Sequence, residues 1–404
     1  MKGKQTILIL GAGIAGLRCA LDLADQIGER KDSKIVLVNK TPYHTLHSTL
    51  YEVVTAKDIR EVLCMPLREL IGKRPIHLII DTVKQIDPIH QKVSLNQSGT
   101  IRYDYLVIGL GNTPDIGKVP GIAEYATVLN SFEDALYLRA IVNELLIKKK
   151  KISVVIGGAG AVGCELAGTL AYFNKELCQG RDSYEAQVVI DLIEQGGRVL
   201  PGEETHLALA MEQKLRTLGV SLYFGKAIKR VNKMHVKLSN NSDIPYDLLI
   251  WTGGSHGTRP VNEVGFETDA RDRIRVMPNL QARGFSRVYV VGDAAHFGVT
   301  KRQSLSPSVV YATTQGAHVA KNIYRQLHNH PQQSYVPPLN PRAFNFGNYA
   351  ALLPIKSWTL YGKFGLLLKK LLVFDYLLNI MPLHKIMSSR TRRSAVIAYS
   401  RFSK

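Results

Sequence analysis

The sequence predicts an α/β fold that contains one strand–turn–helix unit twice, and three observations lead to this prediction. A short apolar run, residues 6–10, leads into GAGIAG at residues 11–16, and a second run, residues 152–156, leads into GAGAVG at residues 158–163. Each glycine motif continues into apolar residues at helical spacing. The composition, with 45% hydrophobic and 21% charged residues, is that of a globular protein. A chain of 404 residues is long enough for more than one domain of about 100 to 200 residues.

The three glycines of each motif have different tasks in a dinucleotide-binding turn. The first permits the tight turn, the second lets a pyrophosphate approach the backbone, and the third lets the helix pack on the strand. A single motif is a weak signal, because a glycine-rich loop can serve packing alone. Two copies in the same context predict two Rossmann-like domains. The glycines concerned are Gly11, Gly13 and Gly16 in the first copy and Gly158, Gly160 and Gly163 in the second.

An acidic residue about 20 positions after such a motif usually binds the adenosine ribose, and the two copies differ here. The strand after the first motif ends at Asn39, which can accept a hydrogen bond but carries no charge. The strand after the second ends at Glu194, 31 residues beyond Gly163. We expect both residues to contact ribose. A carboxylate at Glu194 favours NADH over NADPH, although Arg198 nearby weakens that preference.

Three further apolar segments have the form of strands that end in glycine, namely residues 103–111, 246–254 and 286–293. The last ends in Gly292-Asp293, an acid suited to a ribityl hydroxyl. These segments and the two motifs together resemble the flavoproteins with two dinucleotide-binding domains, in which the first site holds FAD and the second NAD(P)H. The resemblance covers residues 5 to 325.

Within that superfamily the chain is similar to the type II NADH:quinone oxidoreductases. Five segments carry this resemblance: Thr41-Pro-Tyr-His44 with Leu50-Tyr-Glu-Val53, Pro120-Gly121 with Glu124, Ala135 and Arg139, Gly163-Cys-Glu165-Leu-Ala-Gly168, the long insertion before Glu194, and Trp251-Thr-Gly-Gly254. The implied activity is hydride transfer from NADH to FAD and then transfer of two electrons to a membrane quinone, without proton pumping. The implied domains are an FAD domain of residues 1–118 and 278–341, an NADH domain of residues 119–277, and a tail of residues 342–404.

The resemblance also implies the binding residues. FAD contacts are expected from Gly11, Gly13, Ala15, Gly16, Asn39, Lys40, Gly109, Gly111, Gly292 and Asp293. NADH contacts are expected from Gly158, Gly160, Gly163, Glu165, Glu194, Gly253 and Gly254. Glu165 and Gln315 are the candidate catalytic residues, with two alternatives left open: Glu165 could only stabilise the start of its helix, and Gln315 could be plain helix surface.

The sequence departs from the family at several positions, which leaves the electron acceptor open. His47-Ser48 stands where the family has Gln-Pro, Thr169 replaces a glutamate, and Val310 and Thr314 replace glutamines. Sulfide:quinone reductases, soluble NADH-dependent reductases and a non-catalytic NADH sensor therefore remain as alternatives. Disulfide reductases do not fit, since the four cysteines contain no pair beside the flavin and no CxxC motif. No metal site is expected.

The last 63 residues hold a net charge of +10 out of +19 for the chain. Phe364, Leu367, Leu371, Phe374, Leu378 and Met381 form an apolar stripe at helical spacing, with Lys363, Lys369, Lys370 and Lys385 around it. We expect an appended amphipathic segment that binds an anionic membrane surface, with packing on the protein body or on a second subunit as the alternative. Its removal is expected to spare flavin binding.

The expected location is the cytoplasmic face of the cell membrane. The apolar run near the N-terminus is too short for a signal peptide, and no stretch reaches about 18 uninterrupted apolar residues. A homodimer is among the expected partners. Nucleic acid is not, because the basic run Arg390–Arg393 lacks a binding fold or aromatic residues around it.

Overall fold

The structure is a computed structural model, and it describes residues 4–28, 32–55, 64–179, 187–258, 265–300, 304–340, 342–347, 350–355 and 358–381. Lys385 and the basic run Arg390–Arg393, both part of the predicted tail, lie outside the described residues. For residues 178, 179, 354 and 355 only the backbone is described.

The first half of the molecule is built on a five-stranded parallel sheet. Its order is β21 (Val288–Val290), β9 (Tyr105–Ile108), β1 (Gln5–Leu10), β2 (Ser33–Asn39) and β5 (Ile76–Ile80). Strand β1 is central, and Ile7 pairs with Ile35 on one side and Tyr105 on the other. Helices α1 (Ile14–Ile27) and α8 (Val309–Leu327) pack together against it. The run Ile7 to Leu10 is fully buried, as the central strand of a parallel sheet requires.

Smaller elements complete this half. They are β3 (Tyr43–Thr45) with β4 (Cys64–Pro66), a short 3-10 turn at His47–Thr49, α3 (Leu67–Ile71), the antiparallel sheet β6 (Val83–Asp87), β7 (Lys92–Leu95) and β8 (Thr100–Arg102), a 3-10 turn at Gly292–Ala294, and β20 (Ile274–Arg275) with β22 (Ala295–His296). Helix α2 (Leu50–Thr55) belongs to this stretch of the chain but packs on the second half, where Tyr51 and Val54 lie in the core.

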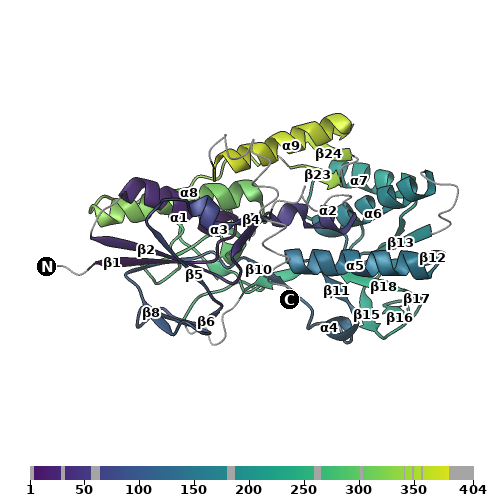
Figure 1. Ribbon diagram of the computed structural model, residues 1–404. Helices are drawn as coiled ribbons and strands as arrows, with labels where there is room; N and C mark the ends of the chain where they lie inside the picture. The colour runs from purple at the N-terminus through teal and green to yellow at the C-terminus, as the bar shows by residue number, and fades with distance from the viewer. Residues whose placement is uncertain are drawn as a thin grey trace.

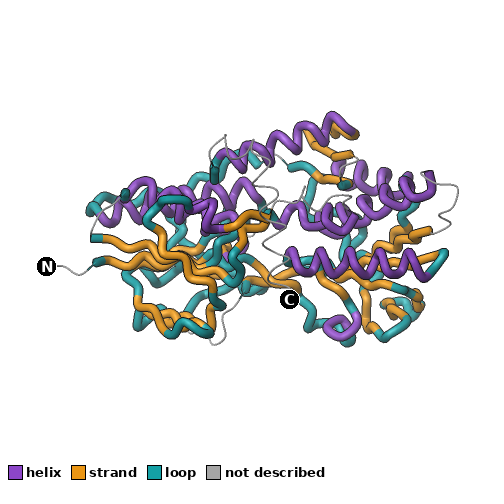
Figure 2. The backbone as a smooth tube through the Cα atoms, in the orientation of Figure 1, coloured by secondary structure: helices purple, strands orange, loops and turns teal. Residues whose placement is uncertain are grey.

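The second half repeats the same plan. Its sheet has the order β11 (Thr127–Val128), β18 (Leu248–Trp251), β12 (Lys151–Gly157), β13 (Gln187–Ile193) and β14 (Ser221–Tyr223). Around it lie α4 (Ile122–Tyr125), α5 (Phe132–Lys148), α6 (Ala161–Gln179), α7 (Thr205–Thr217) and the sheet β15 (Ile228–Val231), β16 (His235–Leu238) and β17 (Asp243–Pro245). The predicted fold of two Rossmann-like units is confirmed, and Figure 2 shows their strands in two separate groups.

The two halves are joined by a pair of crossing strands. β10 (Asn112–Pro114) pairs antiparallel with β19 (Ser255–Gly257), so the outgoing and returning chain run side by side. Ile274 and Val276 already lie in the core of the first half. The domain boundaries, with the NADH domain ending at residue 277, remain a prediction.

The described part of the C-terminal segment packs on both halves. It contains the antiparallel sheet β23 (Phe344–Phe346), β24 (Ala350–Ile355) and β25 (Trp358–Gly362), followed by α9 (Lys363–Leu378). Phe344 and Phe346 are buried in the core of the second half, whereas Tyr376 and Leu377 are buried in that of the first. Figure 1 shows α9, in yellow, lying over both halves.

Helix α9 has one buried and one exposed face, and large apolar side chains lie on both. Four residues of the predicted stripe are exposed, at 60% for Phe364, 53% for Leu367 and Leu371, and 46% for Leu378. Among the described residues, these four stripe positions are not covered by the body of the chain, whereas Phe374 is half-buried and Met381 is buried. Within the described residues, no helix is long and apolar enough to cross a membrane.

Candidate active site

The first and third glycines of both motifs have the geometry that a dinucleotide turn requires. Gly11 and Gly158 have φ of +90° and +107°, a backbone conformation that favours glycine. A Cβ atom on Gly16 would lie 2.0 Å from the carbonyl oxygen of Gly11, and one on Gly163 would lie 2.0 Å from that of Gly158. Any side chain at the third position would therefore push the helix away from the strand.

The middle glycines differ from these because they have free space around them. A Cβ on Gly13 or Gly160 would meet no atom within 4 Å, so neither glycine is needed for packing. The open space lies where α1 and α6 begin, at Ile14 and Ala161. A helix N-terminus with an open glycine in front of it is suited to a pyrophosphate. Both turns therefore fit the phosphates of a dinucleotide.

The predicted ribose residues hold equivalent places in the two halves. Asn39 Oδ1 accepts the N–H of Ala12 at 2.8 Å, and Glu194 Oε2 accepts the N–H of Ala159 at 2.9 Å. Ala12 and Ala159 are the second residues of the two motifs. An oxygen with one hydrogen bond keeps a lone pair for another donor. Asn39 and Glu194 can thus shape the turn and still receive a ribose hydroxyl.

Most of the other predicted FAD residues gather around the first turn. A Cβ on Gly11 would lie 2.4 Å from the oxygen of Gly109, and one on Gly292 would lie 3.3 Å from Cβ of Ala15. Gly111 and Gly292 have positive φ. The Lys40 side chain, by contrast, is exposed.

The predicted glycines of the second site also lie beside their turn. A Cβ on Gly158 would lie 2.7 Å from Cα of Gly253, and Gly254 has φ of +113°. Trp251 fixes this segment by donating its indole N–H to the Asp115 carbonyl at 2.8 Å. The segment Trp251–Gly254 thus lies directly beside the second glycine turn.

Asp293 and Gln315 line one cavity, as expected for residues of a common site. Its walls also include Arg273, Gly292, Ala295, Leu305, Ser306, Pro307, Ser308, Tyr311 and Ala312. Gln315 Oε1 accepts the N–H of Gly292 at 2.7 Å, so its amide NH₂ is left for the cavity. The alternative that Gln315 is helix surface is wrong, because the residue is only 3% exposed. Burial raises the pKa of the Asp293 carboxyl to about 6, against the opposing effect of Arg273.

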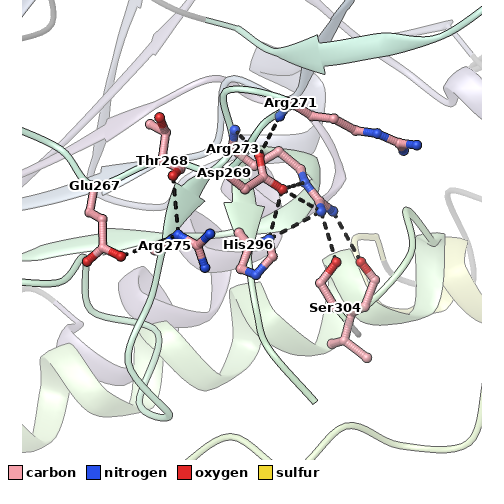
Figure 3. Close-up of polar contacts among 9 residues, drawn as sticks. Glu267, Thr268, Asp269, Arg271, Arg273, Arg275, His296 and Ser304 are labelled. Carbon is pink, nitrogen blue, oxygen red and sulfur yellow. Dashed lines mark hydrogen bonds and ion pairs between the residues drawn. The ribbon is translucent and has the colours of Figure 1, made fainter. Parts of the chain in front are cut away.

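Arg273 is held at this cavity by a cluster of polar side chains, shown in Figure 3. Its guanidinium donates to Asp269 Oδ2 at 2.7 Å and to Ser304 Oγ at 2.9 Å. His296 Nδ1 lies 2.8 Å from the same carboxylate oxygen. Burial alone would raise the pKa of Asp269, but hydrogen bonds from Arg273 and His296 hold it well below its ordinary value. The cluster thus holds the Arg273 guanidinium, itself paired with Asp269, at the cavity that Asp293 lines.

Glu165 is the centre of a second, buried cluster between the two halves. Its Oε1 accepts from Lys369 Nζ at 3.0 Å, from Tyr51 OH at 3.0 Å and from the N–H of Asn345 at 2.8 Å. Lys369 Nζ also donates to Tyr51 OH at 2.9 Å. Among the described residues, Oε2 of Glu165 has no hydrogen-bond partner. The carboxylate is therefore fixed through one of its two oxygens.

Lys369 corrects one expectation. It was predicted as a cation beside the exposed stripe, but it is only 8% exposed and points into the protein. Every third or fourth residue of α9 falls on one face, and Lys369 falls on the face that contains Leu366 and Tyr376. Its charge is balanced by Glu165, which explains how a lysine tolerates that burial.

A second carboxyl group adjoins this cluster. Glu52 Oε1 accepts from the side-chain amide of Asn345 at 2.8 Å. Burial raises the pKa of Glu52, with Lys369 and Asn345 acting in the opposite direction. The side-chain oxygen of Asn345 is buried and has no partner in the described structure. The cluster therefore holds one unmet acceptor and a carboxyl that keeps its proton to higher pH.

Sequence reasoning missed several of these residues. Tyr51 and Glu52 stood within the segment Leu50–Val53, but no role was assigned to them. Arg273 had one usable signal, an aspartate four residues before it at Asp269. Asn345 and Lys369 had none, because they lie 180 and 204 positions from Glu165.

Comparison with known proteins agrees with this geometry. Residues 5–319 match the family described as pyridine nucleotide-disulphide oxidoreductase. The type II NADH:quinone oxidoreductase of Staphylococcus saprophyticus is 26% identical over 344 residues, which are 82% of this chain and 85% of that protein. The Staphylococcus aureus protein of the same name is 25% identical over 381 residues, 91% of this chain and 94% of its own.

Two solved structures share the fold over almost the whole chain. One is NDH2 from Plasmodium falciparum in complex with NADH, with a TM-score of 0.79, 17% identity, and coverage of 99% of this chain and 98% of that chain. The other is the sulfide:quinone oxidoreductase from Aquifex aeolicus, with a TM-score of 0.76, 20% identity, and coverage of 95% and 96%. Although that family's name refers to disulphides, the three cysteines whose side chains are described are free and buried. With the family match spanning residues 5–319 and both dinucleotide turns in place, the chain belongs to the pyridine nucleotide-disulphide oxidoreductase family.

Proposed function

We propose that this protein is a type II NADH:quinone oxidoreductase, which oxidises NADH with FAD as its cofactor and reduces a quinone at a membrane surface. The observation that carries the proposal is the pair of phosphate turns in one chain, each with an open middle glycine in front of a helix. The name shared by the curated relatives, which align with 82% to 91% of this chain, supports the same activity.

Each half of the molecule would bind one of the two ligands. Asn39, Asp293 and Gln315 would hold FAD in the first half, and Glu194 would hold the NADH ribose in the second. When bound, FAD supplies the redox chemistry, since it accepts a hydride from NADH and passes two electrons on. A carboxylate at Glu194 repels the 2′-phosphate of NADPH, so NADH is the expected donor.

The protein must also deliver a proton, because reduction of a quinone by NADH takes up one proton from solution. Glu52 is suited to store it, since burial raises the pKa of its carboxyl. Asn345 bridges Glu52 to Glu165, because its backbone N–H donates to Glu165 and its side-chain amide donates to Glu52. We infer that this cluster faces the nicotinamide and the acceptor, with Glu165 as the residue that touches them.

The exposed stripe of α9 supports attachment to a membrane surface. Phe364, Leu367 and Leu371 are each more than half exposed, and Trp358 on β25 is 80% exposed. Lys363 and Lys370 are exposed on the same helix and suit anionic lipid headgroups. We place this surface on the cytoplasmic face of the cell membrane, as a peripheral contact. A homodimer remains a prediction.

Anaerobic reduction of the FAD-loaded protein tests the proposal. NADH should bleach the flavin absorbance, and a short-chain quinone added afterwards should restore it at once. Bleaching without recovery would indicate another acceptor or a sensor, and absence of bleaching by NADH would contradict the proposed donor. NADPH is the matched control donor, and it should bleach the flavin much more slowly.

A further inference from the structure

The peptide of Ala12, in the middle of the first phosphate turn, is held on both sides. Its N–H donates to Asn39, and its carbonyl oxygen lies 2.8 Å from Nδ1 of His44. His44 has no exposed surface at all. The turn expected to bind the FAD pyrophosphate therefore takes its shape partly from a buried histidine.

The hydrogen bonds of His44 determine its tautomer. A carbonyl oxygen can only accept, so Nδ1 must bear the proton that points to Ala12. Nε2 is then an acceptor, and it lies 2.6 Å from the hydroxyl of Tyr376 on α9. Burial lowers the pKa of His44 to about 4 and raises that of Tyr376, so both groups are neutral near pH 7 and the tyrosine donates. A directed chain of two hydrogen bonds thus runs from α9 to the turn.

The second turn serves as an internal control for this arrangement. The carbonyl of Ala159, equivalent to that of Ala12, accepts from the backbone N–H of Leu200 at 2.8 Å and from Cys164 Sγ at 3.3 Å. Leu200 follows Glu194 by six positions, much as His44 follows Asn39 by five. Both donors belong to the second half itself. The link to the C-terminal helix is thus a property of the first turn.

The end of α9 makes another contact with the same region. Arg18, on the helix that follows the first turn, donates to the carbonyl oxygen of Asn379 at 3.0 Å and to its side-chain oxygen. Tyr376 is 3% exposed, while Leu371 and Leu378 on the other face of the helix are exposed. One helix therefore presents an apolar surface outwards and fastens the first turn inwards.

We propose that Tyr376 and His44 are positioning residues for FAD, which fasten the first phosphate turn to helix α9 so that FAD binding and seating of α9 stabilise one another. Such a coupling is reciprocal: the free energy by which a seated α9 strengthens FAD binding equals the free energy by which bound FAD stabilises the seating of α9. The inference rests on the proposed assignment of the first turn to FAD. It makes the C-terminal helix part of the cofactor site as well as a candidate surface for lipid.

The test compares Y376F with Y361F in the full-length protein. Tyr361 on β25 is a matched control, since its hydroxyl bonds Tyr172 of the second half. Removing the Tyr376 hydroxyl leaves Nε2 of His44 buried without a donor, so the Kd for FAD, measured by flavin fluorescence, should rise about tenfold or more. Y361F should bind FAD like the wild type. Equal FAD affinity in Y376F and the wild type would overturn the proposal.

Hydrogen exchange of residues 363–381 gives a readout that does not depend on turnover. Adding FAD should slow exchange there in the wild type and in Y361F, and should do so much less in Y376F. H44N adds a second variant, because its amide can still donate to Ala12 but does not reach Tyr376. H44N should therefore weaken the effect of FAD on α9, and an undiminished effect would contradict the link. If the wild type binds no FAD, the proposed function itself fails.

Discussion

The two phosphate turns of this protein have the same backbone and different supports. In both, the second residue of the motif donates its N–H to the side chain that ends the next strand, Asn39 in one half and Glu194 in the other. The carbonyl of that residue is held by a side chain tied to the C-terminal helix in the first half, and by the chain's own backbone in the second. The repeated motif thus determines the backbone conformation of each turn. The surrounding residues determine whether the turn is linked to the C-terminal helix.

The difference also concerns charge. Glu194 brings a carboxylate whose other oxygen accepts the N–H of Gly196 at 2.7 Å. Asn39 brings a neutral amide whose NH₂ donates to the carbonyl of Thr41 at 2.7 Å. A carboxylate in place of Asn39 would face that carbonyl with a second acceptor. The amide is therefore required by its neighbours, which explains the departure from the usual acid.

The largest expected effect concerns the way the C-terminal helix is attached to the two halves. In K369M, Glu165 loses its cation while it remains buried, and the free energy of unfolding should fall by about 3 kcal/mol. K370M is the matched control, because Lys370 is the exposed neighbour on the same helix and its loss should cost less than about 0.5 kcal/mol. Denaturant unfolding measures both. Equal values would mean that the buried pair does not anchor α9.

A pH titration sharpens the comparison between the turns. His44 has its pKa lowered by burial to about 4, so the unfolded state binds a proton more readily between pH 6.5 and 4. Its contribution to stability is present above pH 6.5 and is lost as the pH falls towards 4, by about 3 kcal/mol in all. FAD should be released as the pH falls to about 4, where His44 of the folded protein takes up a proton, and H44N should keep FAD to lower pH. Release of FAD with the same pH profile in H44N would rule out His44 as the cause.

Exchanging the two ribose residues tests whether they are equivalent. N39D should weaken FAD binding by about 1 to 3 kcal/mol, because the new carboxylate loses the donation to Thr41 and faces its carbonyl. E194Q should raise KM for NADH about tenfold with little change in kcat, since a charged acceptor for the ribose becomes neutral. Titration with FAD and steady-state kinetics measure these effects. Tighter FAD binding in N39D would show that the usual acid is better in both halves.

The smallest effect on stability is expected on the outer face of α9. The double variant L367Q/L371Q removes exposed apolar surface, so the free energy of unfolding should change by less than about 0.5 kcal/mol. Binding to anionic liposomes should nevertheless fall about tenfold or more, at roughly 1 kcal/mol for each side chain. NADH oxidation with ferricyanide should be unaffected. Unchanged liposome binding, measured by cosedimentation, would place the membrane contact elsewhere.

Much of the fold of this protein could be predicted from the sequence. The repeat of strand, glycine turn and helix is local, so the fold and the places of Gly11, Gly16, Gly158 and Gly163 follow from spacing alone. The role of the C-terminal segment could not be predicted. A lysine within an apolar stripe looks exposed in the sequence, and only the packing of α9 shows that Lys369 lies inside.

The sequence by itself therefore determined the two dinucleotide turns, their order and the residues that end the strands beside them. The tertiary structure alone decided which side chains of the two halves meet helix α9, as Glu165 meets Lys369 and His44 meets Tyr376 across 204 and 332 positions. The physical reason is that a turn is specified by backbone conformation and short-range sterics, which neighbouring residues encode. A buried polar pair depends instead on two distant segments being packed together, and sequence spacing carries no record of that.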